Sequence, residues 1–275
     1  MQKTDKCDLH IHTRFSDGTW SVEELLERIK SAGITLFSIT DHDTVAGALA
    51  MEKLQKPEGM VYIRGVEFAG YRKDRVYHIL GYGYDPDNRA IHDLAKANTA
   101  AAYIWYEAVI DFMSSRFSLI DMDEYRAYTH EPSRGGFKAV SYLMDKGVIS
   151  HPSRFFPYGV ESGATAPIPT VDKVIDIIKS AGGHSFLAHP AGYTGYGQFS
   201  TDDLNYWKEI GISGIECHHP SADAKTTDEM VRWCRKNKLM ISGGSDCHGT
   251  FLEQRKLGFP HITADNLLFP YAVYL

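Results

Sequence analysis

The chain has 275 residues, 43% hydrophobic and 23% charged, a composition typical of a globular protein with one or two domains. Its formal net charge of −6 argues against extended nucleic acid as a partner, because such binding relies on a basic surface. No apolar run reaches the roughly 18 residues that a membrane helix needs, so no membrane partner is expected. The four cysteines form no CxxC pair and the N-terminus does not resemble a signal peptide, which together predict free thiols and a cytoplasmic location.

Short apolar segments alternate with segments of helical periodicity in the first third of the chain. We expect strands at residues 7–11, 34–40, 60–68 and 75–84, with the last two paired as a hairpin. Ser21 and Glu24 have the spacing of a capping box, and Gly33 is placed to end the helix that they begin. A second helix is predicted at residues 44–54.

The pattern changes in the middle of the chain and then returns. Residues 86 to about 158 are rich in helix formers, which predicts a helical insertion whose longest helix covers residues 90–113. After it, a helix capped by Thr170 is followed by alternating strands and helices. The expected strands are residues 184–188, 213–217 and 239–242, and the expected helices are residues 201–210 and 223–237. Seven strands, mostly in βα units, favour an α/β barrel-like fold over an open sheet.

Histidines and carboxylates follow the ends of the predicted strands. His10 and His12 lie on one face of the first strand end, because strand side chains alternate, and two convergent imidazoles suit a divalent metal. This pair alone is weak evidence for a metal, because two partly exposed strand histidines are the more ordinary explanation. After the second strand, we expect Asp43 to cap the next helix and Asp41 to orient a metal ligand.

Similar residues recur at the later strand ends. A carboxylate that ends a buried strand is costly unless it is paired or bound to metal, and Glu67 is placed where it could bridge two metals. The other candidates at strand ends are His42, His78, His189, Asp246 and His248. Polar groups at six strand ends of one fold are hard to explain by packing, so they predict a metal centre at the mouth of the barrel.

The order of these motifs resembles that of the PHP (polymerase and histidinol phosphatase) family of metal-dependent phosphoesterases. The matching segments are DLHIHTRFSDG, ITDHDT, GVE, YHILGYGY, FLAHP, GIE and GGSDCHG. The resemblance implies a distorted seven-stranded (β/α)7 barrel made of residues 5–84 and 165–275. The helical insertion, residues 85–164, is similar to that of the small nucleotide-phosphoesterase branch and would form one wall of the substrate cleft.

The resemblance also implies up to three divalent metal ions, which could be manganese, iron or zinc. The first would lie between His10, His12, Glu67 and Asp246, and the second between Glu67, His78 and His189. The third would take Asp17, His42 and His248. Asp17 lies in Ser16-Asp17-Gly18, which would otherwise be interpreted as a turn. Glu67, Asp246 and His248 are the candidate catalytic residues.

The implied activity is hydrolysis of a small phosphorylated substrate, a nucleotide phosphate ester, by metal-activated hydroxide, with phosphate as a product. Candidate substrate-binding residues are Arg14 beside the first motif, Arg134 in the insertion, and His219. Relatives with this insertion carry Arg-Pro-His where this chain has Arg134-Gly135-Gly136, so a histidine associated with phosphate binding is missing. The alternatives are a 5′–3′ exonuclease on short oligonucleotides, a metal-dependent hydrolase of other bonds, and a non-catalytic metal-binding module.

Overall fold

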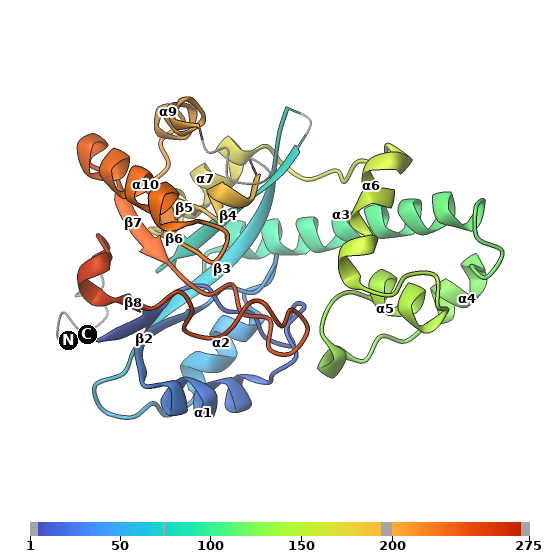
Figure 1. The fold of residues 1–275 in the computed structure, drawn as a ribbon, viewed down its shortest axis with the longest axis horizontal. Coiled ribbons are helices and arrows are strands. Elements are labelled where there is room, and N and C mark those ends of the chain that lie inside the picture. Colours follow the sequence, from blue (N-terminus) through green and yellow to red (C-terminus); the bar gives the residue numbers. More distant parts are fainter. Residues whose placement is uncertain (1–4, 74, 194–199, 271–275) are drawn as a thin grey trace.

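The computed structural model describes residues 5–73, 75–193 and 200–270 (Figure 1). An eight-stranded sheet forms its centre, in the order β7-β6-β5-β4-β3-β2-β1-β8. The strands are β1 (Lys6–Asp8), β2 (Ile34–Ile39), β3 (Val61–Arg72), β4 (Arg75–Tyr82), β5 (His184–Leu187), β6 (Gly214–His218), β7 (Met240–Gly243) and β8 (Ile262–Thr263). The pairs β3–β4, β4–β5 and β1–β8 are antiparallel and the other pairs are parallel, so the predicted hairpin is confirmed.

The sheet curls so that β1 and β7, which are not neighbours in the strand order, come close together. Beyond the regular strands, the chain after β1 and the chain after β7 exchange backbone hydrogen bonds. These run from Leu9 N to Gly243 O (3.1 Å), from Asp246 N to His10 O (2.8 Å) and from His12 N to Cys247 O (2.9 Å). The predicted α/β barrel is therefore confirmed, and the two-residue β8 adds a short strand to the seven expected.

Helices cover the outside of this barrel. They are α1 (Val22–Ala32), α2 (Ala46–Lys53), α7 (Val171–Ser180), the short α8 (Pro190–Tyr193), α9 (Thr201–Glu209) and α10 (Ala224–Asn237). The capping box of Ser21 and Glu24 is present, and Gly33 ends α1 with a positive φ of 67°. Thr170 holds the N-cap position of α7 as predicted, but its side chain accepts no capping hydrogen bond.

The segment between β4 and α7 consists of helices joined by turns and loops. Its elements are α3 (Arg89–Ser114), α4 (Met122–Ala127), the 3₁₀ turn η1 (Pro132–Arg134), α5 (Lys138–Asp145), the 3₁₀ turn η2 (Pro152–Arg154) and α6 (Phe156–Ser162). We call α3 to α6 the helical lobe. Figure 1 shows the lobe extending away from the barrel, with α3 running between the two.

The helical lobe has an apolar core of its own. Val109, Tyr125 and Phe155 belong to this cluster, which is distinct from the clusters of the barrel. The first turns of α3 instead contribute Ile91 and Leu94 to the barrel's largest apolar cluster, so the long helix anchors the lobe at one end. Among the described helices, including the 26-residue α3, none combines the length and apolar character needed to cross a membrane.

Candidate active site

The nine predicted metal ligands lie together at the mouth of the barrel, where Glu67 and His78 lie within β3 and β4 and the others lie in the segments that follow strands. They are His10, His12, Asp17, His42, Glu67, His78, His189, Asp246 and His248. Six of their side chains are at most 9% exposed, whereas His42, His78 and His189 are 19%, 29% and 14% exposed. The open side of the cluster therefore lies at these three histidines.

The first group is a compact set of two nitrogens and two oxygens. The Nε2 atoms of His10 and His12 are 3.1 Å apart. Each lies 3.1–3.3 Å from Glu67 Oε2 and 3.2–3.3 Å from Asp246 Oδ1. Ligands at zinc-like bond lengths on a tetrahedron are separated by about 3.3 Å, so these four atoms fit one divalent ion. Their mixed nitrogen and oxygen chemistry also suits manganese or iron.

Glu67 presents its two oxygens to different histidines. Oε1 lies 2.9 Å from His189 Nε2 and 3.1 Å from His78 Nδ1. Oε2 faces the first group and also lies 3.2 Å from His42 Nδ1. A carboxylate in this arrangement can bridge two ions, as the sequence pattern predicts for Glu67.

The third group surrounds Asp17, on the opposite side of His12. Asp17 Oδ2 lies 3.2 Å from His248 Nε2 and 4.0 Å from His42 Nε2. The His12 ring stacks on His248 at 4.0 Å between centroids. His12 Nδ1 lies 3.6 Å from Asp17 Oδ1 and is a buried nitrogen without a hydrogen-bond partner among the described residues. These donor atoms could hold a further cation.

Electrostatics also favour a cation at the centre. Burial works to raise the pKa of Glu67, but the charges of His42 and His10 hold it well below its usual range. Burial works to lower the pKa of His12, but hydrogen bonds to Asp246 and Glu67 raise it to about 10. The carboxylates thus require positive charge close by. A divalent ion held by neutral histidines supplies that charge, so the residues present fit a metal centre.

Comparison with known proteins identifies the family. The PHP domain model matches residues 8–156, more than half of the chain. The chain belongs to the PHP domain family. A solved structure from Bifidobacterium adolescentis, assigned as a metal-dependent phosphoesterase, has a TM-score of 0.75 and 25% identity, covering 97% of this chain and 93% of the other. This PHP protein is a metal-dependent phosphoester hydrolase.

Relatives with assigned activities cover most of this PHP protein. A 5′-3′ exoribonuclease of Haemophilus influenzae is 27% identical over 89% of this chain and 90% of its own length. A phosphoribosyl 1,2-cyclic phosphate 1,2-diphosphodiesterase of Eggerthella lenta is 26% identical over 92% and 97%. A 3′,5′-nucleoside bisphosphate phosphatase of Chromobacterium violaceum is 24% identical over 88% and 86%.

Glu216 is a residue of the site that the sequence reasoning did not single out. It lies in β6, is fully buried, and its Oε1 is 2.9 Å from His10 Nδ1. Its Oε2 accepts a 2.6 Å hydrogen bond from the backbone N–H of His189. By accepting from Nδ1, the carboxylate turns His10 Nε2 towards the first group. The signal was available, because Glu216, like Glu67, is a carboxylate near the end of a strand that the sequence predicts (residues 213–217 and 60–68).

We expect Glu216→Gln to weaken metal binding of this PHP protein about 10–100-fold, because the amide orients His10 less strongly than the carboxylate. Titration of the metal-free protein with Mn²⁺ measures the effect. Glu209→Gln, on the exposed end of α9, is the matched control and should bind like the wild type. Equal affinities in all three proteins would rule out this role for Glu216.

Asp41 holds the loop that carries Asp17. Its Oδ1 accepts hydrogen bonds from Thr13 N and Ser16 Oγ, both at 2.7 Å, and its Oδ2 accepts from Thr13 Oγ1 at 2.7 Å. Asp41 therefore positions the segment leading to a candidate ligand and makes no hydrogen bond to a candidate histidine among the described contacts.

The prediction that Asp43 caps the next helix is wrong. Its backbone has a positive φ of 50°, which turns the residue towards β3 and α3. There its Oδ1 accepts from Ala69 N (2.9 Å) and from Asn98 Nδ2 (2.8 Å). Thr44 Oγ1 instead accepts from Ala46 N, the first residue of α2. Asp43 thus ties the helical lobe to the barrel next to the site.

The predicted substrate-binding arginines are held in ion pairs. Arg14 Nη2 lies 2.7 Å from Glu24 Oε2. Arg134 contacts Asp145 through both terminal nitrogens, at 2.6 and 2.8 Å. Both guanidinium groups are about two-fifths exposed, and their binding of substrate stays a prediction.

His219, the third predicted substrate-binding residue, lies beside the metal ligands. Its Nε2 is 3.4 Å from Asp246 Oδ2, and its ring centroid is 5.3 Å from that of His189. Arg255, which no sequence feature distinguished from an ordinary loop residue, places its Nη1 at 2.6 Å from His219 Nε2.

Proposed function

We propose that this protein hydrolyses a phosphate ester of a small nucleotide and that the nine clustered side chains hold up to three divalent ions. The observation that supports this most is the convergence of buried histidines on both oxygens of Glu67 and on Asp246. When bound, such ions activate a water at neutral pH and place positive charge against the phosphoryl oxygens.

The protein side chains position the reacting groups. Glu67 would hold the first two ions at a fixed separation, because its two oxygens face different histidines. Asp246 would complete the first group, and His248 would complete the third together with Asp17. Phosphoryl transfer needs mainly positioning and charge stabilisation, which a rigid and largely buried cluster provides.

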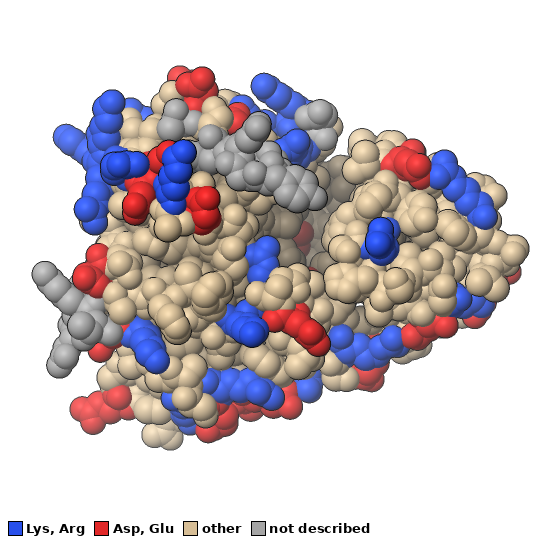
Figure 2. Space-filling view, viewed as in Figure 1, with Lys and Arg blue, Asp and Glu red and all other residues tan. Residues whose placement is uncertain are grey.

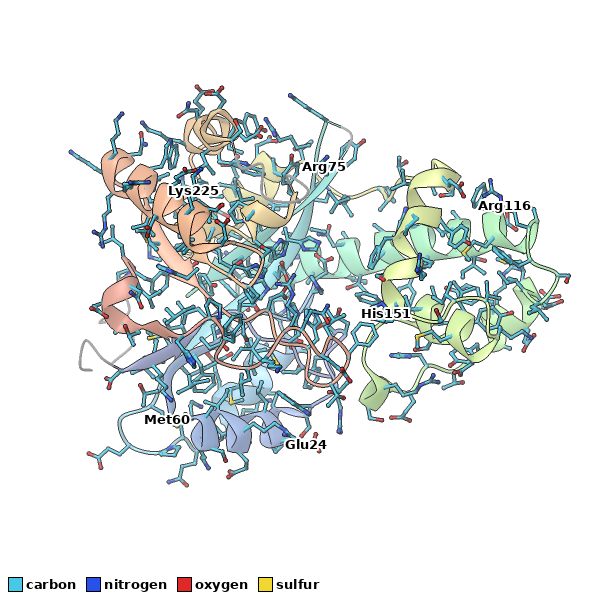
Figure 3. All side chains as sticks on the ribbon, in the orientation of Figure 1. Glu24, Met60, Arg75, Arg116, His151 and Lys225 are labelled. Carbon is cyan, nitrogen blue, oxygen red and sulfur yellow. The ribbon has the colours of Figure 1, made fainter. Side chains whose placement is uncertain are left out.

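A cavity near the chain segments that carry the third group of ligands is suited to the rest of the substrate. It has a volume of about 440 Å³ and lies between the helical lobe and the loop after β7. Its lining includes Arg134, Ser141, His151 and Phe251. An aromatic ring, an imidazole, hydroxyls and a guanidinium together can stack on a base and hydrogen-bond to it. Figure 2 shows the molecule hollowed between barrel and lobe, and Figure 3 shows His151 at the barrel-facing side of the lobe.

None of the nine candidate ligands lines this cavity, but two of its lining residues belong to segments that neighbour ligand-bearing ones. Gly136, next to lining residue Gly135, donates its N–H to the backbone oxygen of Asp17 at 2.7 Å. Thr250, another lining residue, follows His248 by two positions. We therefore propose that the segment 85–164 acts as an insertion in the barrel of residues 5–84 and 165–275 and forms one wall of the substrate cleft.

The glycines at 135 and 136 leave room for Phe251. A Cβ atom added to Gly135 would lie 2.6 Å from Phe251 Cβ, and one added to Gly136 would lie 2.5 Å from Phe251 Cζ. Any larger residue at either position would displace this ring. The position where the usual triplet has a histidine is thus a glycine packed against Phe251 in this chain.

The relatives support a nucleotide-like substrate. One is named for nucleoside bisphosphates, one for a cyclic phosphate of phosphoribose, and one as an exoribonuclease. All three names involve a phosphorylated ribose. A net charge of −6 favours a short substrate over an extended polynucleotide.

A hydrolysis screen tests the proposal. The protein is reconstituted separately with Mn, Fe and Zn and assayed on nucleoside monophosphates, 3′,5′-bisphosphates, short oligonucleotides, sugar phosphates and an aryl phosphate. We expect the highest kcat/KM for a mononucleotide or bisphosphate. Preference for oligonucleotides degraded from the 5′ end would favour the exonuclease alternative. Turnover of the aryl or sugar phosphates alone would contradict the nucleotide assignment.

We expect Phe251→Ala to raise the KM for the preferred nucleotide about 5–100-fold, the range that corresponds to loss of one base-stacking contact. The KM for an aryl phosphate should change much less. Phe156→Ala on the exposed surface of α6 is the matched control and should change neither value. Equal KM changes for both substrates in Phe251→Ala would show that the ring does not contact a base.

A further inference from the structure

Arg255 brings a guanidinium group to the edge of the candidate metal cluster. Its Nη1 lies 3.4 Å from Asp246 Oδ2, and the side chain is 22% exposed. Asp246 turns its other oxygen, Oδ1, towards the Nε2 atoms of His10 and His12. One carboxylate therefore separates the guanidinium from the first group of ligands. Neither Arg14 nor Arg134 forms an ion pair with a candidate ligand.

Hydrogen bonds before and after Arg255 hold the loop that carries it. Arg255 N donates to Leu252 O at 2.9 Å. Three residues later, Gly258 N donates to the buried carboxylate of Asp8 at 2.8 Å. Asp8 also accepts from Ser245 N at 2.8 Å. The loop is therefore tied, through Asp8, to the segments that carry the ligands His10 and Asp246. The position of Arg255 is thus defined by the barrel.

The protein leaves much of this guanidinium's hydrogen-bonding capacity unused. Its Nη1 contacts His219 Nε2 at 2.6 Å, while Ser221 N contacts His219 Nδ1 at 3.1 Å. With its Nδ1–H donating to Ser221 Oγ at 2.7 Å, neutral His219 can accept from Arg255 at Nε2, so this contact orients the guanidinium and uses only one of its N–H groups. Within residues 5–73, 75–193 and 200–270, Arg255 Nε and Nη2 have no hydrogen-bond partner. An arginine in this state can receive an anion in the plane of its fork.

We propose that Arg255 is a catalytic residue that donates hydrogen bonds to the non-bridging oxygens of the substrate's phosphoryl group, with His219 as its positioning residue. The inference rests on the proposed phosphoester hydrolysis. In the reaction, the oxygen of water forms a bond to phosphorus and the ester P–O bond breaks. The electron pair goes to the leaving oxygen, which takes up a proton from solvent, while the attacking water releases one of its protons to solvent. Arg255 keeps its proton throughout and offsets the negative charge on the phosphoryl oxygens.

The experiment compares metal-loaded wild-type protein with Arg255→Met and Arg255→Lys. Arg232→Met, on the exposed face of α10, is the control. Each protein is assayed for metal content, for kcat/KM on an aryl phosphate, and for the inhibition constant of inorganic phosphate. The aryl substrate isolates the phosphoryl contact from the cavity.

We expect Arg255→Met to keep its metals, to lose about 10²–10³-fold in kcat/KM, and to be inhibited by phosphate at least about tenfold more weakly. Arg255→Lys should recover part of both losses, because lysine restores the charge without the fork. The control should match the wild type in all three measurements.

Two outcomes would overturn the inference about Arg255 without contradicting the proposed phosphoester hydrolysis. In one, Arg255→Met retains metals, kcat/KM and phosphate inhibition within threefold of the active wild type. In the other, Arg255→Met loses metal and added metal restores full kcat/KM, which would make Arg255 a support of Asp246 only. A metal-loaded wild type that hydrolyses no phosphoester would instead contradict the proposed function itself.

Discussion

Glu67→Gln is expected to remove at least one bound metal and to lower kcat/KM more than about a thousand-fold. The glutamine keeps the shape of the side chain but replaces one oxygen with an NH₂ group that cannot bind a metal ion. Both oxygens of Glu67 face histidines, at 2.9–3.3 Å, so either orientation of the amide disrupts one group. Loss of several kcal/mol of charge stabilisation corresponds to this change in rate.

Elemental analysis and steady-state kinetics on the same preparation check the prediction. Glu58→Gln, in the exposed loop before β3, carries the same chemical change away from the cluster and should retain metal and activity. Full metal content together with an unchanged rate in Glu67→Gln would remove Glu67 as a bridging residue. A variant that loses one metal and keeps its rate would show that the bridge serves structure alone.

Removing the metals with a chelator should abolish hydrolysis and lower the melting temperature by roughly 10 °C. An ion present at a thousand times its Kd stabilises the folded state by about 4 kcal/mol, and each kcal/mol shifts the transition of a domain of this size by about 2–4 °C. The apo protein also has to keep Asp17, Glu67 and Asp246 buried together with only histidine side chains to offset their charge, which is unfavourable.

Calorimetry of the apo and reconstituted protein measures this shift, and activity should return in step with added metal. Glu67→Gln provides the internal comparison, since a protein that already lacks one ion should show a smaller shift on chelation. An unchanged melting temperature after complete removal of metal would mean that the carboxylates tolerate burial without a cation. Retained hydrolysis in the apo protein would contradict the proposal that the clustered side chains bind metals needed for the reaction.

Local sequence patterns were sufficient for most of the fold. The apolar run of β2 and the capping box of α1 each determine their element through residues that are near neighbours in the chain. The same holds for the hairpin of β3 and β4, whose predicted ends differ by a few residues from those observed. The strand β8 was missed because two residues, Ile262 and Thr263, carry no periodicity. Its pairing with β1 depends on tertiary contacts alone.

The site was predictable to the extent that its residues follow strand ends. His10, Glu67 and Asp246 could be placed together because a barrel brings all its strand ends to one mouth. Their grouping followed from the resemblance, because spacing in the chain does not specify which oxygen faces which nitrogen. Asp43 was misassigned because a positive φ, which the sequence does not reveal, directs its side chain to Asn98.

Arg255 shows the limit of the sequence argument most clearly. It lies in a loop without periodicity, and its contact with His219 joins residues 36 positions apart. Such a contact depends on the path of the loop, which Gly258 and Asp8 fix across 250 positions. Long-range side-chain contacts of this kind leave no pattern in a single sequence.

The barrel is closed by the same backbone segments that carry the first group of ligands. His10 and Asp246 share a backbone hydrogen bond, and Asp8 is joined to Ser245 across 237 positions. A chain that lacks β7 and the loop after it would therefore lack Asp246, one of the four side chains of the first group. A cation bound by this group would join residues 10 and 246, so the same ion that serves the reaction would also hold the seam of the barrel shut.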